Sequence, residues 1–363
     1  MSLKYQFSLV SVVFLLGLNW SHLATAQQAE VYTVAAVSVD EVAETSEAAR
    51  EQALQHGKVI AFQRLLSRIV PRSYESQFPQ LNKSALDGLI RGIEVFDEKR
   101  SSVRYLAALK VTFKAKDVRS FLRKSGLPFS ETRSKPLLVL PLMQYGYELI
   151  LWGSPNPWRL AWQRREKADG LIPIIVPPGD LKDRQIIDVR TARRGVQQRL
   201  NFLRNRYNAG DIMVVEAKYS DDRPDALEII IDYFGGAGTS SIVKNFDRPE
   251  NIMDLADYLD QAVDLVHSEL EDDWKGRTLI QLGTLSSMIV RIPVSSFPEW
   301  LAIRKRLAGI SVMDRVTVTS LTSLEGRVAL NFYGDSNQLV VALAQEDLIL
   351  DRSSGMWTVQ LRQ

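Results

Sequence analysis

The sequence predicts a protein of mixed α+β and α/β class, built from three modules that follow a signal peptide. The chain has 363 residues, more than a single hydrophobic core usually organises. Stretches with the period-two pattern of strands alternate along it with stretches that have the 3.6-residue period of helices. A continuous apolar run at residues 136–143 is typical of a strand that helices cover on both faces, which favours an α/β unit in the middle.

The first 26 residues have the features of a secretory signal peptide. Lys4 precedes an apolar run at residues 7–18, and Ala24 and Ala26 supply the small residues of a cleavage site before Gln27. The run is shorter than the roughly 20 residues that a membrane-spanning helix needs. We therefore expect cleavage after Ala26 and a soluble periplasmic protein without a transmembrane segment in its mature chain. An uncleaved N-terminal anchor is the alternative.

The composition excludes several classes of function. The formal net charge is only +2, so no nucleic-acid partner is expected. The chain contains no cysteine, which excludes disulfides, zinc–thiolate centres and cysteine nucleophiles. Nothing in the sequence calls for a cofactor.

The N-terminal module, residues 27–126, is organised around a long amphipathic helix at residues 46–69. Its larger apolar residues fall on one line at helical spacing, and Ala49 and Ala53 beside them would let the helix approach a sheet closely. Runs at 93–99 and 103–113 are predicted to pair as a hairpin of that sheet. The apolar line consists of Val59, Phe62, Leu66 and Ile69, whereas Arg50, Arg64 and Arg68 are predicted to face water.

A linker at residues 127–136 leads to a middle α/β domain at residues 137–280. After the first buried strand we expect a second at 171–176, one helix across 189–207 and a long helix at about 252–274. Three extended segments lie between these two helices. The glycine-rich run at 235–238 is predicted to be a hairpin turn, because a phosphate-binding loop would need a helix after it.

The C-terminal module, residues 281–363, has the element order βαββαβ of a ferredoxin-like domain. A last extended run at 356–361 is expected to pair at an edge of its sheet. The predicted elements are strand 287–294, a helix from 296, strands 311–319 and 326–333, helix 336–345 and strand 348–351.

Several stretches resemble a bacterial family known as domain of unknown function 2066. The resemblance covers most of the mature chain and implies an exported protein without assigned catalytic residues. The order of elements in the middle domain is also similar to the α/β domain at the N-terminus of the periplasmic protein TolB. The stretches are AREQALQHGKVIAFQRLLSRI from Ala49, VRSFLRKSGLP from Val118, RSKPLLVLPL from Arg133, NPWRLAW from Asn156 and IVPPGDLKD from Ile175.

No catalytic or metal-binding set emerges from the titratable residues. His56 is expected at the edge of a helix, against the core. His267 shares one helix flank with three carboxylates of metal-ligand type, but a single flank rarely completes a coordination sphere, so a solvated face is favoured. The three carboxylates are Asp260, Asp264 and Glu271.

The best candidate for a binding patch lies in the middle domain. Trp158 and Trp162 could stack on a sugar ring or a peptide side chain, with Arg159 beside them, although core packing of the indoles is the favoured interpretation. Asp180 belongs to a loop that follows a predicted strand, where ligand clefts form in open α/β sheets.

These observations favour a non-enzymatic envelope protein that presents surfaces to other envelope proteins or to cell-wall components. One alternative is an exported hydrolase that uses carboxylates such as Asp180 and Asp183, which would require a raised pKa on one of them. The other is a glycan- or small-ligand-binding module centred on Trp158, which would require an exposed indole.

Overall fold

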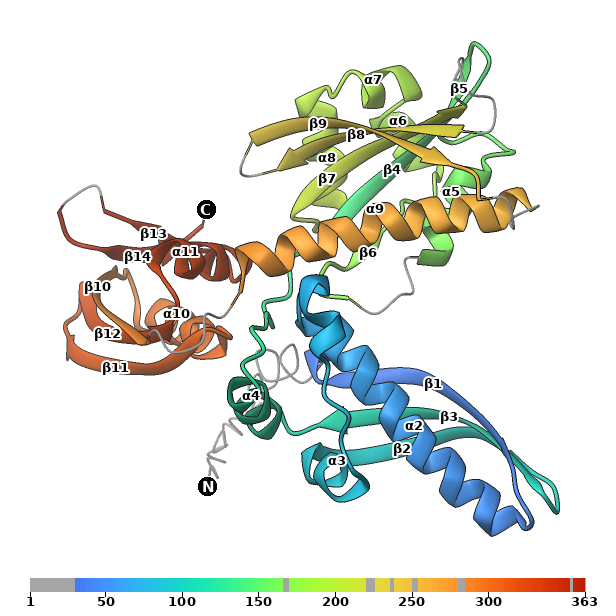
Figure 1. Cartoon of the computed structure of the whole chain (residues 1–363). Helices are drawn as coiled ribbons and strands as arrows, with labels where there is room; N and C mark the ends of the chain where they lie inside the picture. Colours follow the sequence, from blue (N-terminus) through green and yellow to red (C-terminus); the bar gives the residue numbers. More distant parts are fainter. Residues whose placement is uncertain are drawn as a thin grey trace, which may run out of the picture.

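The computed structural model describes residues 30–165, 170–219, 226–235, 238–249, 254–279, 285–352 and 355–362. The predicted signal peptide lies outside these residues. The described chain forms three separate sheets, of three, six and five strands, each with its own helices (Figure 1). The mixed α+β class is therefore confirmed. None of the described helices has both the length and the apolar character required to cross a bilayer.

The N-terminal sheet is antiparallel, and α2 (Ser46–Ile69) lies across one of its faces (Figure 1). The predicted hairpin of β2 and β3 is present, and β1 pairs with the other side of β3. Three short helical segments complete the module. The strands are β1 (Thr33–Val42), β2 (Ile90–Arg100) and β3 (Arg104–Phe113), and the short segments are η1 (Arg72–Gln77), α3 (Lys83–Leu89) and α4 (Ala115–Lys124).

Helix α2 approaches its sheet closely through small residues. Ala49 and Ala53 are fully buried, as their spacing predicted. Gly57 continues the same line one turn further on, where a Cβ atom would lie 2.4 Å from a side-chain atom of Leu109. Phe62 is 4% exposed, in agreement with its place in the apolar line.

Two predictions for α2 are wrong. Arg68 does not face water but is buried, and its Nη1 donates to the carbonyl oxygens of Val31 at 2.6 Å and Thr33 at 2.8 Å. The guanidinium thereby supplies donors to backbone that enters β1. His56 is not a core residue: its side chain is 59% exposed, and its Nδ1 lies 2.6 Å from the carboxylate of Glu41.

The middle sheet has helices on both faces, as the apolar run predicted. Alternate residues of β4 enter two different cores: Leu140 packs with the cluster that contains Leu200, and Val139 with the cluster that contains Trp158 and Val263. The strand order is β5-β4-β7-β8-β9, and β6 pairs with β4 outside this path. The strands are β4 (Leu137–Tyr145), β5 (Glu148–Ile150), β6 (Ile174–Ile175), β7 (Asp211–Tyr219), β8 (Ala226–Gly235) and β9 (Gly238–Asp247).

Five helices cover this sheet. Helices α5 and α9 contribute to the core that contains Trp158, and α6, α7 and α8 contribute to the other. Figure 1 shows α9 as the long helix that runs beneath the sheet towards the C-terminal module. The helices are α5 (Pro157–Arg165), α6 (Leu181–Ile186), α7 (Val189–Arg193), α8 (Gln197–Arg206) and α9 (Leu255–Arg277).

Two elements of the middle module differ from the prediction. The single helix expected across 189–207 is broken into α7 and α8 at Gly195, whose φ of +61° lies in the left-handed region that favours glycine. The strand expected at 171–176 is reduced to β6, because the amides of Leu171 and Ile172 bond the carboxylate of Glu271 and not a neighbouring strand. The hairpin prediction is confirmed, since Gly235 pairs with Gly238; Gly236 and Ala237 lie outside the described residues.

The C-terminal sheet has the order β11-β12-β10-β14-β13. Its elements follow the predicted order up to β13, but the last strand does not pair at an edge. It inserts between β10 and β13, parallel to the first and antiparallel to the second, which allows Val359 to be fully buried. The elements are β10 (Leu285–Pro293), α10 (Phe297–Gly309), β11 (Met313–Leu321), β12 (Glu325–Tyr333), α11 (Ser336–Gln345), β13 (Leu348–Asp351) and β14 (Thr358–Leu361).

The segment between the first two modules is packed against both of its neighbours. Ser130 Oγ lies 2.6 Å from Thr278 Oγ1 at the end of α9, and Trp274 Nε1 donates to the carbonyl of Thr132 at 2.6 Å. The hydroxyl of Thr132 lies 2.8 Å from that of Ser311 in the C-terminal module. All three modules therefore meet around this segment.

Candidate functional site

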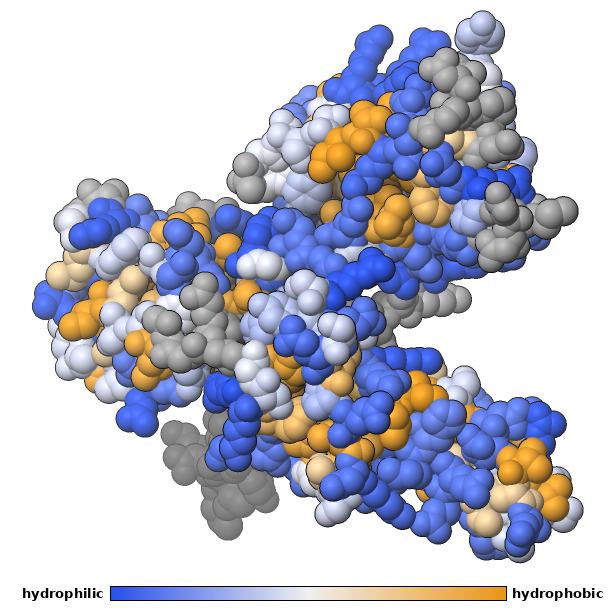
Figure 2. Space-filling view, in the orientation of Figure 1, coloured by the Kyte–Doolittle hydropathy of each residue, from blue (hydrophilic) through white to orange (hydrophobic). Residues whose placement is uncertain are grey.

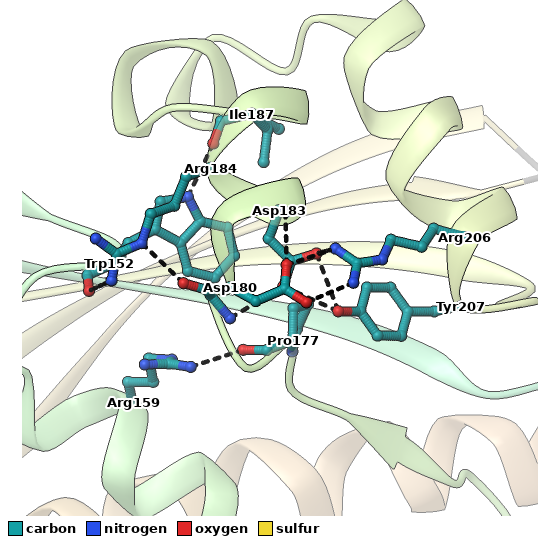
Figure 3. A network of polar contacts seen from close by, with 10 residues as sticks. Trp152, Arg159, Pro177, Asp180, Asp183, Arg184, Ile187, Arg206 and Tyr207 are labelled. Atoms are coloured by element: carbon teal, nitrogen blue, oxygen red, sulfur yellow. Dashed lines mark hydrogen bonds and ion pairs between the residues drawn. The ribbon is translucent and has the colours of Figure 1, made fainter.

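A network of charged side chains surrounds the loop that follows β6 in the middle module (Figure 3). Asp180 caps α6 by accepting from the amide of Asp183 at 2.9 Å. Asp183 is completely buried and accepts from the amide of Gly179 at 3.0 Å and from the hydroxyl of Tyr207 at 2.9 Å. Both carboxylates thus have fixed positions.

Arg206, at the end of α8, joins these two carboxylates. Its guanidinium donates to Asp180 at 2.6 and 2.8 Å and also bonds Asp183 (Figure 3). Hydrogen bonding from Arg206 holds the pKa of Asp180 well below its usual range. A general acid needs a raised pKa, so Asp180 does not have the property that the hydrolase hypothesis requires.

The loop itself is held by further arginines. Arg184 Nε donates to the carbonyl of Gly179 at 2.8 Å, and Arg159 Nη2 donates to that of Pro177 at 2.8 Å. Figure 3 shows Arg159 approaching the loop from the side opposite Arg206. The structure therefore brings two members of the predicted patch, Arg159 and Asp180, to one loop, where they bond the protein's own groups.

The two tryptophans of the predicted patch lie in the core. Trp158 and Trp162 are both 0% exposed and meet edge to face, with ring centroids 5.8 Å apart. Trp158 Nε1 donates to the carbonyl of Val215 in β7 at 3.1 Å. Neither indole offers a face to solvent, so the exposed Trp158 that a glycan-binding module would require is absent from this structure.

A second polar cluster lies where α9 faces the N-terminal module. His267 is 2% exposed, and Arg165 Nη2 lies 2.9 Å from its Nδ1. Because a guanidinium can only donate, Nδ1 must accept, which assigns the ring proton to Nε2. Burial and the nearby Arg165 charge lower the pKa of His267 to about 3, so the ring is neutral.

The carboxylates that share this flank of α9 have protein partners. Burial raises the pKa of Glu271, which accepts from the amides of Leu171 and Ile172. Asp260 bonds Arg164 at 2.9 Å, and Asp264 lies 3.2 Å from Arg165. Within the part of the chain that the structure describes, no three such residues converge as a metal site would require.

Next to this cluster, a cleft of about 1430 Å³ lies between the N-terminal and middle modules. Figure 2 shows it as the notch that separates the two lobes. One wall comes from α2 and the segment after it, and the other from α9 with Arg165 and Gly170. Its half-buried apolar lining comprises Val59, Ile60, Phe78, Pro79 and Leu81.

Charged side chains of both signs line the cleft, among them Glu75 and two arginines on the N-terminal wall. Arg64 and Arg72 are both exposed and line the cleft. Arg64 Nη1 donates to the carbonyl of Ala36 at 3.2 Å. Across the described residues, neither guanidinium has a carboxylate partner. These two side chains could therefore bond an anionic group that enters the cleft.

Lys275 closes the base of the cleft. Its Nζ extends from α9 to the carbonyls of Ser67 at 3.0 Å and Val70 at 3.2 Å, which lie at the end of α2. Asp272 accepts from the amide of Arg72 at 3.1 Å. The two walls are thus cross-linked at their base, and the cleft is a fixed feature of the module interface.

The sequence did not reveal the residues that organise these sites. Arg206 and Lys275 each stand near the end of a helix, where basic residues are common, and the spacing of Tyr207 predicted only a place on a helix. Comparisons of the chain with protein-family models, with curated proteins and with solved structures give no match in any of the three.

Proposed function

We propose that the protein is an exported, non-enzymatic binding protein of the cell envelope, which holds an extended segment of another exported protein in the cleft between its first two modules. The observation that supports this most directly is the cleft itself, about 1430 Å³ in volume and cross-linked at its base by Lys275.

The dimensions and lining of the cleft favour a polypeptide over a small molecule. Sites for small ligands have volumes of about 300–1,000 Å³ and enclose most of the ligand, whereas this cleft is larger and open along one side. The N-terminal wall carries both half-buried apolar side chains and exposed polar ones. An extended segment would match this wall if it had an apolar residue to pack against Phe78 and Leu81 and an acidic residue to pair with Arg64 or Arg72.

The proposal extends to the family and to the export of the chain. Membership of the domain of unknown function 2066 family is supported by the stretches quoted above, and a TolB-like middle domain by its covered sheet. A ferredoxin-like origin of the last module is supported by its βαββαβ order, with β14 inserted next to β10.

Export is tested by N-terminal sequencing. The sequence of the protein from the periplasmic fraction should begin at Gln27; a start at Met1 in the membrane fraction would contradict export.

Site-directed photocrosslinking in living cells tests the cleft. A photoreactive residue in place of Gln63, which is exposed and lines the cleft, should crosslink to another exported protein. The matched control is Arg50, which is exposed on the same helix but outside the cleft. Arg64→Glu, added to the chain that carries the photoreactive residue at position 63, should weaken the crosslink because it reverses the charge beside that position.

The pattern of crosslinks decides the outcome. Equal crosslinking from positions 63 and 50 would show that the cleft has no special role. A Gln63 crosslink that forms only with lipid or with cell-wall glycan would overturn the choice of a polypeptide. An Arg64→Glu variant that crosslinks as strongly as its parent would remove the role of the arginines.

A further inference from the structure

We propose that β9 pairs with the β9 strand of a second copy of this chain, which would join two middle sheets across a two-fold axis. β9 is the outermost strand of its sheet, next to β8 only (Figure 1). An edge strand exposes a row of unpaired N–H and C=O groups, and proteins that remain monomeric usually block such an edge.

The other sheet edges in the described chain are all interrupted, or too short. β1 has a bulge between Val34 and Val37, where Ala36 adopts a φ of +52°. β2 has one between Phe96 and Lys99, and β11 is shifted in register at two places. The remaining edges, β5, β6 and β13, have three, two and four residues. Bulges and short strands both prevent a further strand from pairing.

β9 has neither a bulge nor a short length, and its one lysine, Lys244, is paired with Glu269 of α9. It pairs with β8 over all ten residues without a register shift. Residues 238–243 carry no charge, proline is absent from the strand, and β9 is exposed along most of its length. Ile242 is 50% exposed and Val243 is 58% exposed, one on each face of the sheet. A strand added at this edge would cover both side chains and bond the free backbone groups.

The distribution of charge favours a second copy as the occupant. In an antiparallel pair about a two-fold axis through Ile242, each Ile242 lies opposite its counterpart, and Ser241 lies opposite Val243 of the second copy. Lys244 then faces Ser240 of the second copy, so no like charges meet. Lys244 is already neutralised by Glu269 at 2.5 Å. The strand is therefore complementary to itself in both charge and apolar content.

A cysteine crosslink tests this register directly, because the natural chain has no cysteine. Ile242→Cys should oxidise to a disulfide-linked dimer, since residues opposite each other at the axis bring their Cβ atoms within about 5.5 Å. Ile289→Cys is the matched control: Ile289 is 59% exposed, but it lies on β10 in another module. It should remain monomeric under the same oxidation.

Sedimentation equilibrium of the unmodified chain provides the second measurement. Over a series from about 1 to 100 µM, the mean mass should rise towards twice that of the monomer. Val243→Lys should hold the chain at the monomer mass, because a lysine is a typical block of an edge strand. Ile289→Lys should associate as the unmodified chain does.

Three results would overturn the inference. One is an unmodified chain that stays monomeric over the whole series. Another is a dimer that Val243→Lys leaves intact, or that forms no disulfide through Cys at position 242. The third is a chain that is monomeric alone and whose β9 amides become protected from hydrogen exchange only when an envelope extract is added. That result would mean that the edge pairs with a strand of another protein.

Discussion

In the N-terminal module, α2 meets its sheet mainly through apolar side chains, whereas the middle module buries titratable groups along with its apolar core. Phe62, Leu65 and Leu66 are at most 4% exposed on the buried face of α2. Around the middle sheet, Asp183, Glu216, His267 and Glu271 are buried to a similar degree. The two modules thus reach comparable burial with different chemistry.

This difference has a physical consequence. Apolar contacts are non-directional, so a helix face needs only the correct spacing and approximate volume to find its place. A buried carboxylate or imidazole must instead meet a particular donor or cation, and its loss leaves the partner unsatisfied. The first module should therefore respond to changes in side-chain volume, and the middle module to changes in charge and pH.

The largest effect is expected for Phe62→Ala in the first module. The substitution removes a nearly buried ring that lies 6.0 Å from the ring of Phe113, and it leaves a cavity behind. Together these changes should lower the free energy of unfolding by about 3 to 5 kcal/mol, measured by urea denaturation. Arg64→Ala, on the exposed side of the same helix, should change it by no more than about 0.5 kcal/mol. Equal costs for the two variants would mean that the helix register is wrong.

Asp183→Ala tests the polar side of the comparison. The variant leaves the Gly179 amide and the Tyr207 hydroxyl without their buried acceptor and should cost about 3 kcal/mol of stability. Asp40→Ala is the matched control, because Asp40 also bonds an arginine, Arg104, but is exposed to solvent. That variant should leave the urea midpoint unchanged. A stabilised Asp183→Ala variant would instead indicate a carboxylate retained for chemistry.

The pH dependence of stability distinguishes the modules further. The pKa of His267 falls from 6.5 to about 3 on folding, so the unfolded chain takes up the proton first. The neutral ring contributes fully to the free energy of unfolding above pH 6.5, and this contribution is lost as the pH falls towards 3. Between pH 7 and pH 5 the loss should be about 2 kcal/mol. Glu271 faces the same cluster with a raised pKa, which acts in the opposite direction. A variant that lacks this histidine separates its effect on the pH dependence of stability from that of Glu271.

That variant is His267→Gln, which keeps an acceptor for Arg165 but cannot titrate. Urea midpoints at pH 7 and pH 5 should differ less for His267→Gln than for the unmodified chain. Parallel pH profiles would show that the ring is already protonated, or accessible to water, in the folded protein.

The same contrast explains which features the sequence predicted. The apolar line of α2 and the hairpin of β2 and β3 follow from periodicity, the covered strand β4 follows from a continuous apolar run, and each is present. Arg68 and His56 were misplaced, since spacing does not reveal whether a polar side chain has a buried acceptor nearby. The break at Gly195, where a Cβ atom would lie 2.5 Å from the ring of Phe234, and the insertion of β14 beside β10 both depend on residues distant in sequence. The cleft could not be predicted, because it exists only between two modules.

The smallest effect is expected for removal of divalent metal. The acidic flank of α9 has ligand-type residues at helical spacing, but Asp260 and Asp264 bond arginines and Glu271 bonds two amides. An ion would have to displace these partners, at the cost of leaving buried groups unsatisfied. Dialysis of the purified protein against a chelator should therefore leave the melting temperature unchanged. A fall of several degrees that added Ca²⁺ or Zn²⁺ reverses would mean that the flank binds metal, and that the arginine contacts of α9 are replaced when it does.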